Sequence, residues 1–255
     1  MIAPVLCYHK IERRRELGVT RLSPRHFAAQ VQALAGAGWR GVSLAEFAAA
    51  IRGERAAGNR ELLVTFDDAY RGLRDYAFPV LRDAGFGAAC FVITDYAGRL
   101  NRWDVAYGGR RFAHLAWRDM ERWTLHGITF ESHTATHPRL SWVGDGQLAD
   151  EMRRSQQAIH SALGTTPTAV AYPYGAVAPR VSAAAREVGY ALGFRVGGRW
   201  SGDAMMIPRA SVHCWSPRLP VVGPLGAVER MVSQVAGQCS VGTALWQRLT
   251  SYHAG

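Results

Sequence analysis

Short apolar runs that end in turn-forming residues recur along the chain and alternate with amphipathic segments. The runs are rich in Val, Ile, Leu and Phe and are too short for buried helices, so they predict buried strands. The predicted strands cover residues 5–9, a short stretch at 42, and residues 62–66, 88–93, 128–132, 169–172, 191–196 and 207–213.

Between these runs, apolar residues recur every three or four positions, which predicts amphipathic helices. Caps and breakers mark their ends, as where Ser23 precedes Pro24 at a helix start. The predicted helices run from 24 to the stop at Gly38, over 44–51, through 76–81 to Gly85 with a kink at Pro79, and over 117–126, 146–163 and 179–188. Residues 95–115 have no clear period and predict a long loop of the kind that often carries binding function.

The alternation of strands and helices predicts one α/β domain over residues 1–255, with a parallel sheet closed or nearly closed into a barrel. No linker, low-complexity tract or internal repeat divides the chain. In barrels of this kind the chemistry lies at the C-terminal ends of the strands. Polar residues that directly follow a predicted strand are therefore the candidate site residues.

The chain is basic, with 30 Lys and Arg against 20 Asp and Glu and a formal net charge of +10. Lys10 is the only lysine, the arginines are scattered, and no nucleic-acid-binding motif accompanies the charge. We therefore expect no specific nucleic-acid partner. The charge leaves open a peripheral contact with an anionic membrane surface.

The four cysteines, at 7, 90, 214 and 239, have neither metal-binding spacing nor the density of a disulfide scaffold, and we expect reduced core thiols. The first residues carry their basic side chains after the apolar run, the reverse of a secretory signal. No apolar run approaches the ~20 residues of a membrane-spanning helix. The expected location is the cytoplasm, with no transmembrane segment.

Two adjacent carboxylates, Asp67 and Asp68, follow the predicted strand 62–66. Like charges this close are unfavourable unless a cation or a proton separates them, and a metal ion is the simplest separator. The alternative is that they cap the helix that follows, although one Asp suffices for a cap.

Two histidines, His133 and His137, follow the predicted strand 128–132 in the sequence SHTATHP. A separation of four residues puts both imidazoles on one side of a helical turn, which suits one metal ion. Two His and one carboxylate leave coordination positions open for water, which is the arrangement of a catalytic rather than a structural zinc site.

A third strand end carries the turn Ala171-Tyr172-Pro173-Tyr174-Gly175, which can present a backbone N–H to a cavity. With the sequence TFDD at 65–68 and HTATH at 133–137, this turn resembles the motifs of the polysaccharide deacetylase family, the NodB-homology carbohydrate esterases of family four. The opening Tyr8-His9 is similar to the YHxI sequence of a branch that acts on poly-N-acetylglucosamine.

The resemblance implies a distorted (β/α) barrel of the seven-stranded, TIM-like, NodB-homology type. It also implies one divalent metal, Zn²⁺ in the first place with Co²⁺ or Ni²⁺ as alternatives, bound by Asp68, His133 and His137. Asp67 would be the general base for hydrolysis of an N-acetyl group on a carbohydrate substrate. The backbone N–H of Tyr174 would contact the substrate and stabilise the oxyanion.

The sequence departs from the family pattern at the third motif, where Ala171 stands in place of the usual Arg. Arg209, on the last predicted strand, could supply the guanidinium from another direction, and a surface arginine is the alternative. The final motif is weakly met by Ser211-Val212-His213, so His213 is the candidate general acid. His9 competes for that role, with a hydrogen-bonded core residue as its other interpretation.

Trp103 and Trp142 lie in loops near the motif strands and are candidates for stacking on a sugar, with core packing as the alternative. The sequence lacks GxSxG and HExxH, and no Lys follows a Gly-rich loop as a P-loop requires. Three hypotheses remain. They are an N-deacetylase acting on N-acetylglucosamine-type sugars in a glycan or lipid-linked precursor, a deacylase, amidohydrolase or O-acetyl esterase acting on a small substrate, and a non-catalytic glycan-binding homologue.

Overall fold

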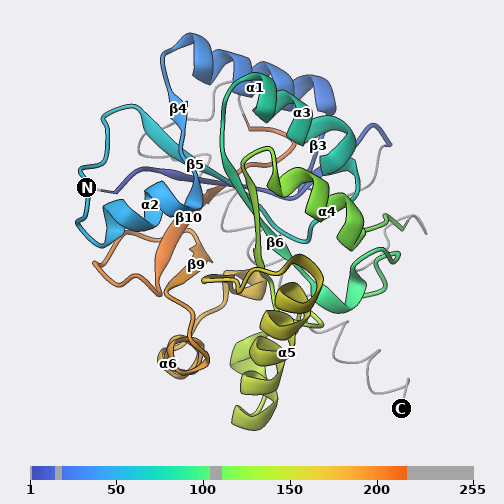
Figure 1. Ribbon diagram of the computed structural model, residues 1–255, viewed down its shortest axis with the longest axis vertical. Coiled ribbons are helices and arrows are strands. Elements are labelled where there is room, and N and C mark those ends of the chain that lie inside the picture. Colours follow the sequence, from blue (N-terminus) through green and yellow to red (C-terminus); the bar gives the residue numbers. More distant parts are fainter. Residues whose placement is uncertain (1, 15–18, 104–110, 217–255) are drawn as a thin grey trace.

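The structure, a computed structural model, describes residues 2–14, 19–103 and 111–216. Seven parallel strands close into a barrel, which confirms the predicted fold class (Figure 1). In order around the barrel they are β1 (Val5–Tyr8), β5 (Glu61–Phe66), β6 (Ala88–Val92), β7 (Ile128–Ser132), β8 (Ala169–Ala171), β9 (Leu192–Val196) and β10 (Ile207–Ser211).

Closure depends on β1, which pairs with β5 on one side and with β10 on the other. Leu6 is in register with Val64 and with Ala210. The short strand β4 (Arg40–Gly41) pairs with the start of β5, where Arg40 is in register with Glu61. A second small sheet, β2 (Lys10–Ile11) with β3 (Arg21–Leu22), was not predicted because its strands are too short to show a period.

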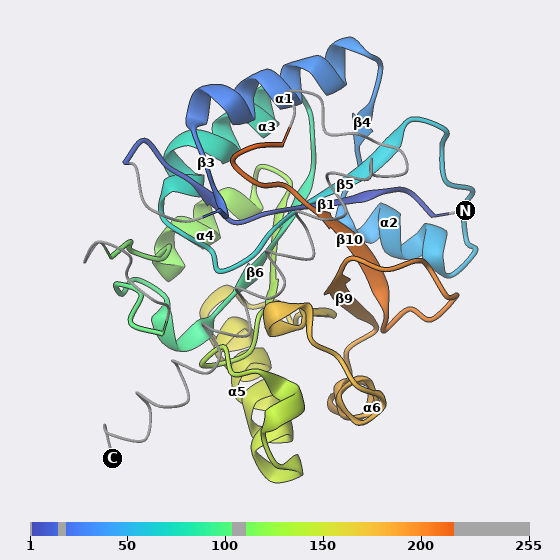
Figure 2. The ribbon, with the colours of Figure 1, turned by 180° about the vertical axis from the view of Figure 1, so that it is seen from behind.

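The helices pack on the outside of the barrel. They are α1 (Pro24–Gly36), α2 (Leu44–Ile51), α3 (Phe78–Asp83), α4 (Trp117–Thr124), α5 (Asp145–Leu163) and α6 (Pro179–Val188). Figures 1 and 2 show α1 and α3 side by side against one side of the barrel, with α5 and α6 on the opposite side. Within the described ranges, no helix has both the length and the apolar character that a membrane crossing requires.

The predicted kink at Pro79 takes a different form in the structure. A π-helical turn, η1 (Leu73–Ala77), precedes α3, and Pro79 lies in the first turn of α3. That position suits proline because the first N–H groups of a helix have no partner within the helix. The chain therefore changes helix type before the proline.

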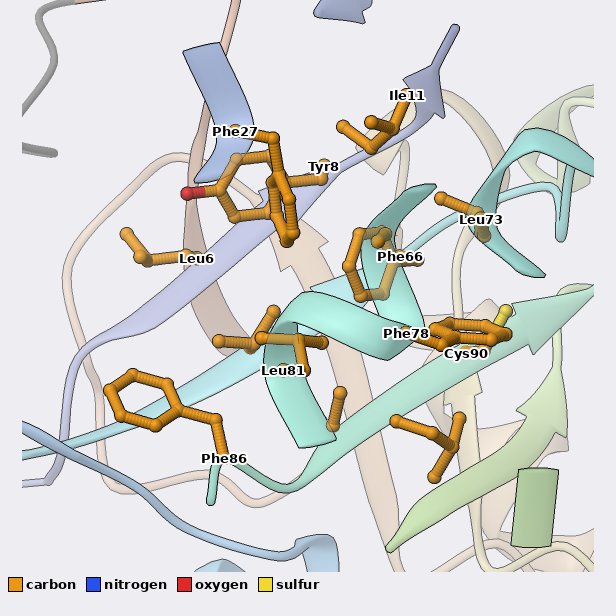
Figure 3. Close-up of a cluster of buried hydrophobic side chains, with 14 of the residues drawn as sticks. Leu6, Tyr8, Ile11, Phe27, Phe66, Leu73, Phe78, Leu81, Phe86 and Cys90 are labelled. Atoms are coloured by element: carbon orange, nitrogen blue, oxygen red, sulfur yellow. The ribbon is translucent and has the colours of Figure 1, made fainter. Parts of the chain in front are cut away.

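Alternate strand residues face the two sides of the barrel wall. On β5, Leu62, Val64 and Phe66 join the outer cluster beneath α1 and α3, in which Tyr8, Phe27 and Phe78 also pack (Figure 3). Leu63 belongs to the inner cluster, so Thr65 and Asp67, two and four residues on, follow it toward the barrel interior. The same alternation puts Arg209 of β10 on the side of Ile207, which is in the inner cluster.

Cys7 and Cys90 are buried free thiols, as expected. Cys214 is exposed, so the expectation of a core thiol was wrong there. The reason is that Cys214 follows the last backbone bond to β1, from the Val212 N–H to the Cys7 carbonyl, and so lies outside the barrel wall. Cys239 lies outside the described residues.

Candidate metal centre and active site

The two aspartates at the end of β5 both approach His133 Nε2, at 4.0 Å from Asp67 Oδ2 and 3.6 Å from Asp68 Oδ1, because the backbone turns after the strand. The Asp67 N–H still donates to the Tyr8 carbonyl of β1, which extends the strand pairing by one residue. Asp68 and Ala69 then adopt left-handed backbone conformations, with φ of 68° and 54°. Such conformations cost about 1–3 kcal/mol for residues other than glycine and cluster at functional sites.

His133 is oriented by a hydrogen bond from its Nδ1–H to the Ala171 carbonyl, at 2.8 Å. This bond leaves Nε2 as the nitrogen with a lone pair for a ligand. Burial lowers the pKa of His133, and burial together with the neighbouring His133 lowers the pKa of His137. Both imidazoles are therefore neutral near pH 7, the form that binds a metal.

Asp68, His133 and His137 come together from the ends of two strands. The Asp68 Oδ1 atom lies 3.6 Å from His133 Nε2 and 3.7 Å from His137 Nε2, and the three ligand atoms are all within 4.8 Å of one another. These N–O separations are too long for hydrogen bonds but are close to the ~3.4 Å edge of a tetrahedral site with ~2.0–2.1 Å bonds. The donor set and its spacing fit one divalent cation.

The loop between the two histidines is held by Glu151 of α5, a buried carboxylate. Its Oε2 accepts from the N–H groups of Ala135, at 3.0 Å, and Thr136, at 2.9 Å, and its Oε1 accepts from the Thr136 hydroxyl at 2.6 Å. His137 has a left-handed φ of 65°, and its N–H donates to the Thr134 hydroxyl. These bonds fix the distance between the imidazoles.

Asp67 lies beside the metal site and is paired with Arg209. The two Nη atoms of Arg209 are each 2.7 Å from one oxygen of the carboxylate, and Nη1 also contacts the Thr65 hydroxyl. The guanidinium carbon lies over the neighbouring rings of Phe91 and Phe194, 5.3 and 5.9 Å from their centroids. Burial alone would raise the pKa of Asp67, but Arg209 and then His133 outweigh it and hold that pKa well below its usual range.

Two residues of the first strand segment approach the other side of Asp67. The Cys7 thiol lies 3.4 Å from Oδ2, and burial raises its pKa well above the usual value, so it is a protonated donor. His9 Nε2 lies 4.0 Å from the same oxygen, and burial lowers the pKa of His9 to about 4. Cys7, His9 and Asp67 could geometrically hold a second ion, but the Cys7 thiol is protonated and Arg209 already neutralises the Asp67 carboxylate.

His213 lies beyond the end of β10, is 7% exposed and stacks on Trp215 with ring centroids 5.0 Å apart. Burial lowers the pKa of His213. His9 Nε2 approaches Asp67, whereas His213 contacts Trp215, Ser216 and Val19. Besides burial, His213 also contributes to the lowered pKa of His9.

Tyr174 and Trp103 both contact the candidate ligand His137. Tyr174 has a left-handed φ of 61° in the turn η5 (Pro173–Gly175), and its ring centroid is 4.7 Å from that of His137. The Trp103 ring is 4.0 Å from His137 and only 6% exposed. Trp142, in the turn η4 (Leu140–Trp142), is 36% exposed and lies under the guanidinium of Arg139. The structure thus brings Trp103, but not Trp142, into ring contact with a site residue.

Two residues at the site were missed by the sequence analysis. Glu151 is a charged residue on the buried face of an amphipathic helix, between Leu148 and Ser155, and that position was a usable signal. His114 donates from Nδ1 to the Asp68 carbonyl at 2.6 Å, and it lies in the segment 95–115 that shows no period. No sequence signal could have identified it.

The sequence matches the polysaccharide deacetylase family over residues 54–193. It is 27% identical over 190 residues to YxkH of Bacillus subtilis (strain 168), a relative whose name assigns it to the polysaccharide deacetylases. That alignment covers 74% of this chain and 63% of the relative, so the chain spans less than two thirds of the relative's length.

Solved structures share the fold. The deacetylase PplD of Streptococcus pyogenes superposes with a TM-score of 0.76 at 21% identity, over 87% of this chain and 97% of that protein. IcaB from Ammonifex degensii superposes with a TM-score of 0.73 at 24% identity, over 92% and 97%. With the barrel, the carboxylate and imidazole cluster and the family match in agreement, the chain belongs to the polysaccharide deacetylase family, whose members are hydrolases that act on acetyl groups.

Proposed function

We propose that this protein is a metal-dependent hydrolase that removes N-acetyl groups from N-acetylglucosamine-type sugars in a glycan or a lipid-linked glycan precursor. The observation that carries the proposal is the pairing of two different carboxylates at one strand end. Asp68 faces two neutral imidazoles, while Asp67 faces a guanidinium. One carboxylate suits a metal ligand, and the other suits a proton acceptor that stays ionised.

Asp68, His133 and His137 would hold the cation. Oxygen and imidazole nitrogen donors in a tetrahedral arrangement favour Zn²⁺, with Co²⁺ or Ni²⁺ as substitutes. When bound, such an ion polarises the acetamide carbonyl and makes a water molecule more acidic.

Asp67 would take a proton from the attacking water, and the low pKa that Arg209 imposes keeps its carboxylate ionised and ready. The backbone N–H of Tyr174 would stabilise the oxyanion, a contact worth about 3–4 kcal/mol in other enzymes. A general acid must then protonate the sugar nitrogen as the C–N bond breaks, which yields acetate and the free amine. His213 is the candidate from the motif, and His9 is the competitor because it approaches Asp67.

The Trp103 ring, packed on His137, would border the acetyl group of the substrate. For Trp142 the support is weaker, because it contacts Arg139 rather than a site residue, although its exposure leaves it available to a longer glycan. The cytoplasmic location and the contact with an anionic membrane surface stay predictions from the sequence.

The test is acetate release from N-acetylglucosamine oligomers by the full chain, first stripped with a chelator and then supplied with Zn²⁺ or Co²⁺. The proposal expects release that returns only with added metal. Release from aryl acetates or small amides alone would favour the deacylase or O-acetyl esterase alternative. Oligomer binding without any release under each metal would favour a glycan-binding homologue.

A further inference from the structure

His114 occupies a fixed position beside the metal site. The segment that carries it pairs with the residues that follow Asp68: the Leu115 N–H donates to the Ala69 carbonyl, and the Arg71 N–H donates to the Ala113 carbonyl, each at 2.8 Å. The side chain is 2% exposed and stacks on Tyr70 with ring centroids 4.7 Å apart. The imidazole therefore has one orientation.

Both ring nitrogens of His114 have partners, and the partners define the tautomer. Nδ1 faces the Asp68 carbonyl at 2.6 Å, which only accepts, so Nδ1 carries the proton. Nε2 faces the indole N–H of Trp103 at 3.4 Å, which only donates, so Nε2 is the acceptor. The ring is neutral, with its donor and its acceptor both in use.

One of these bonds goes to a candidate metal ligand, and the other goes to a residue that packs on a second candidate ligand. The first holds the peptide of Asp68, a residue in a left-handed conformation that needs support from its surroundings. The second holds Trp103, whose ring packs 4.0 Å from the ring of His137. The His114 imidazole thus connects Asp68 and His137 from the side away from the candidate metal position.

Building on the metal-dependent function proposed above, we propose that His114 is a positioning residue that sets the orientation of Asp68 and, through Trp103, of His137. It touches neither the cation nor the substrate. Residues behind metal ligands typically contribute about 10- to 100-fold in metal affinity or activity.

Three substitutions separate the two bonds of His114. His114→Asn keeps an N–H near the place of Nδ1, and His114→Gln keeps an acceptor near the place of Nε2. His114→Phe keeps the ring shape and the stacking on Tyr70 but neither bond. His160→Asn, on the exposed end of α5, is the matched control.

The measurements are the Zn²⁺ dissociation constant, by competition with a chromophoric chelator, and the visible absorption spectrum of the Co²⁺ form. Thermal unfolding of the metal-free proteins reports folding separately. We expect about 10- to 100-fold weaker Zn²⁺ binding and an altered Co²⁺ spectrum in His114→Phe, partial recovery in His114→Asn, and wild-type values in His160→Asn. Trp103→Phe combined with His114→Gln should weaken binding more than His114→Gln alone, because the second bond is then lost as well.

A folded His114→Phe protein with wild-type Zn²⁺ affinity and an unchanged Co²⁺ spectrum would overturn the inference. The proposed function would still stand in that case if the wild-type protein releases acetate. The inference would also be overturned if the Asn, Gln and Phe variants all lost Zn²⁺ affinity equally and lost the same amount of melting temperature in the metal-free form. His114 would then have a general structural role. A wild-type protein that binds no divalent cation and releases no acetate would contradict the proposed function, and the inference that rests on it.

Discussion

Arg209 and Asp67 face each other inside the barrel, with both guanidinium Nη atoms 2.7 Å from the two carboxylate oxygens. The two residues come from β10 and from the end of β5, strands that are separated by β1. Both side chains are nearly inaccessible to solvent. Two parallel hydrogen bonds of this kind fix the orientation of the carboxylate and also stabilise its ionised form.

Removing Arg209 should leave a buried, unpaired charge. We expect Arg209→Met to lower the free energy of unfolding by about 3–5 kcal/mol, measured by urea denaturation. In the double variant with Asp67→Asn, the loss should be smaller than the sum of the two single losses, because no unpaired charge remains. Additive losses would show that the two side chains do not stabilise each other.

The division of roles between the two aspartates predicts different metal contents. Asp67→Asn should retain the metal and lose nearly all acetate release, because the proton acceptor is gone while the ligands remain. His133→Ala should lose the metal itself, because one of three protein ligands is missing. Metal analysis after gel filtration, beside the rate of acetate release, checks both. Equal metal content in the two variants would contradict the assignment.

The general acid can be identified by comparing two alanine variants. The variant lacking the true acid should lose about 10²- to 10⁴-fold in kcat, while the other should change little. The comparison should use an N-acetyl substrate and an aryl acetate, because a phenolate leaves without a proton and its release should be less affected. If both substrates respond equally to His9→Ala and to His213→Ala, neither histidine is the acid.

Glu151 supports the loop between the two candidate histidine ligands, so its loss should affect metal binding although Glu151 is not itself a ligand. We expect Glu151→Ala to weaken Zn²⁺ binding about 10-fold or more and to lower stability, because two N–H groups and a hydroxyl lose their acceptor. Glu151→Gln keeps one amide oxygen and should fall between Glu151→Ala and the wild type. Chelator competition on both variants tests this order.

Glu61, at the start of β5, gives a prediction on pH and stability. Hydrogen bonds from Arg55 first, then from Gly58 and Arg40, lower its pKa from 4.5 to about 2. Because the pKa is lowered in the folded state, the stabilisation is fully present above pH 4.5 and is lost as the pH falls toward 2. Glu61→Gln should therefore be less stable than the wild type by about 1 kcal/mol near pH 7, and denaturation curves of the two proteins should converge near pH 2. A gap that stays constant with pH would exclude this electrostatic origin.

The barrel could be predicted because its strands and helices carry strong local periods. Runs such as Leu62–Phe66 and caps such as Ser23 act within a few residues of the chain, and the structure gives helices 44–51 and 179–188 with the predicted bounds. The position of the Asp pair and the His pair after strands predicted that they share one end of the barrel, although β6 lies between β5 and β7. The choice of Asp68 rather than Asp67 as the ligand came from the family resemblance.

The environment of the site could not be predicted because it depends on distant pairings. His114 reaches Asp68 only through the pairing of residues 113–115 with 69–71, in a segment that has no period of its own. The exposure of Trp142 depends on a 3₁₀ turn, η4, that carries no sequence signal. For Arg209, the alternation along β10 puts it on the inner side with Ile207, but its partner is set by closure of the barrel.

The seam between β1 and β10 also has a consequence for how the molecule is made. Leu6 and Ala210 lie at nearly opposite ends of the described chain, and contacts between such distant residues form slowly and late in folding. A nascent chain that has emerged only as far as β9 would have the imidazoles and Asp67, but not the guanidinium that Asp67 requires. Hydrolytic activity should therefore require that β10 has been synthesised and has closed the barrel, and a chain shortened before β10 should be inactive even where its earlier segments have folded.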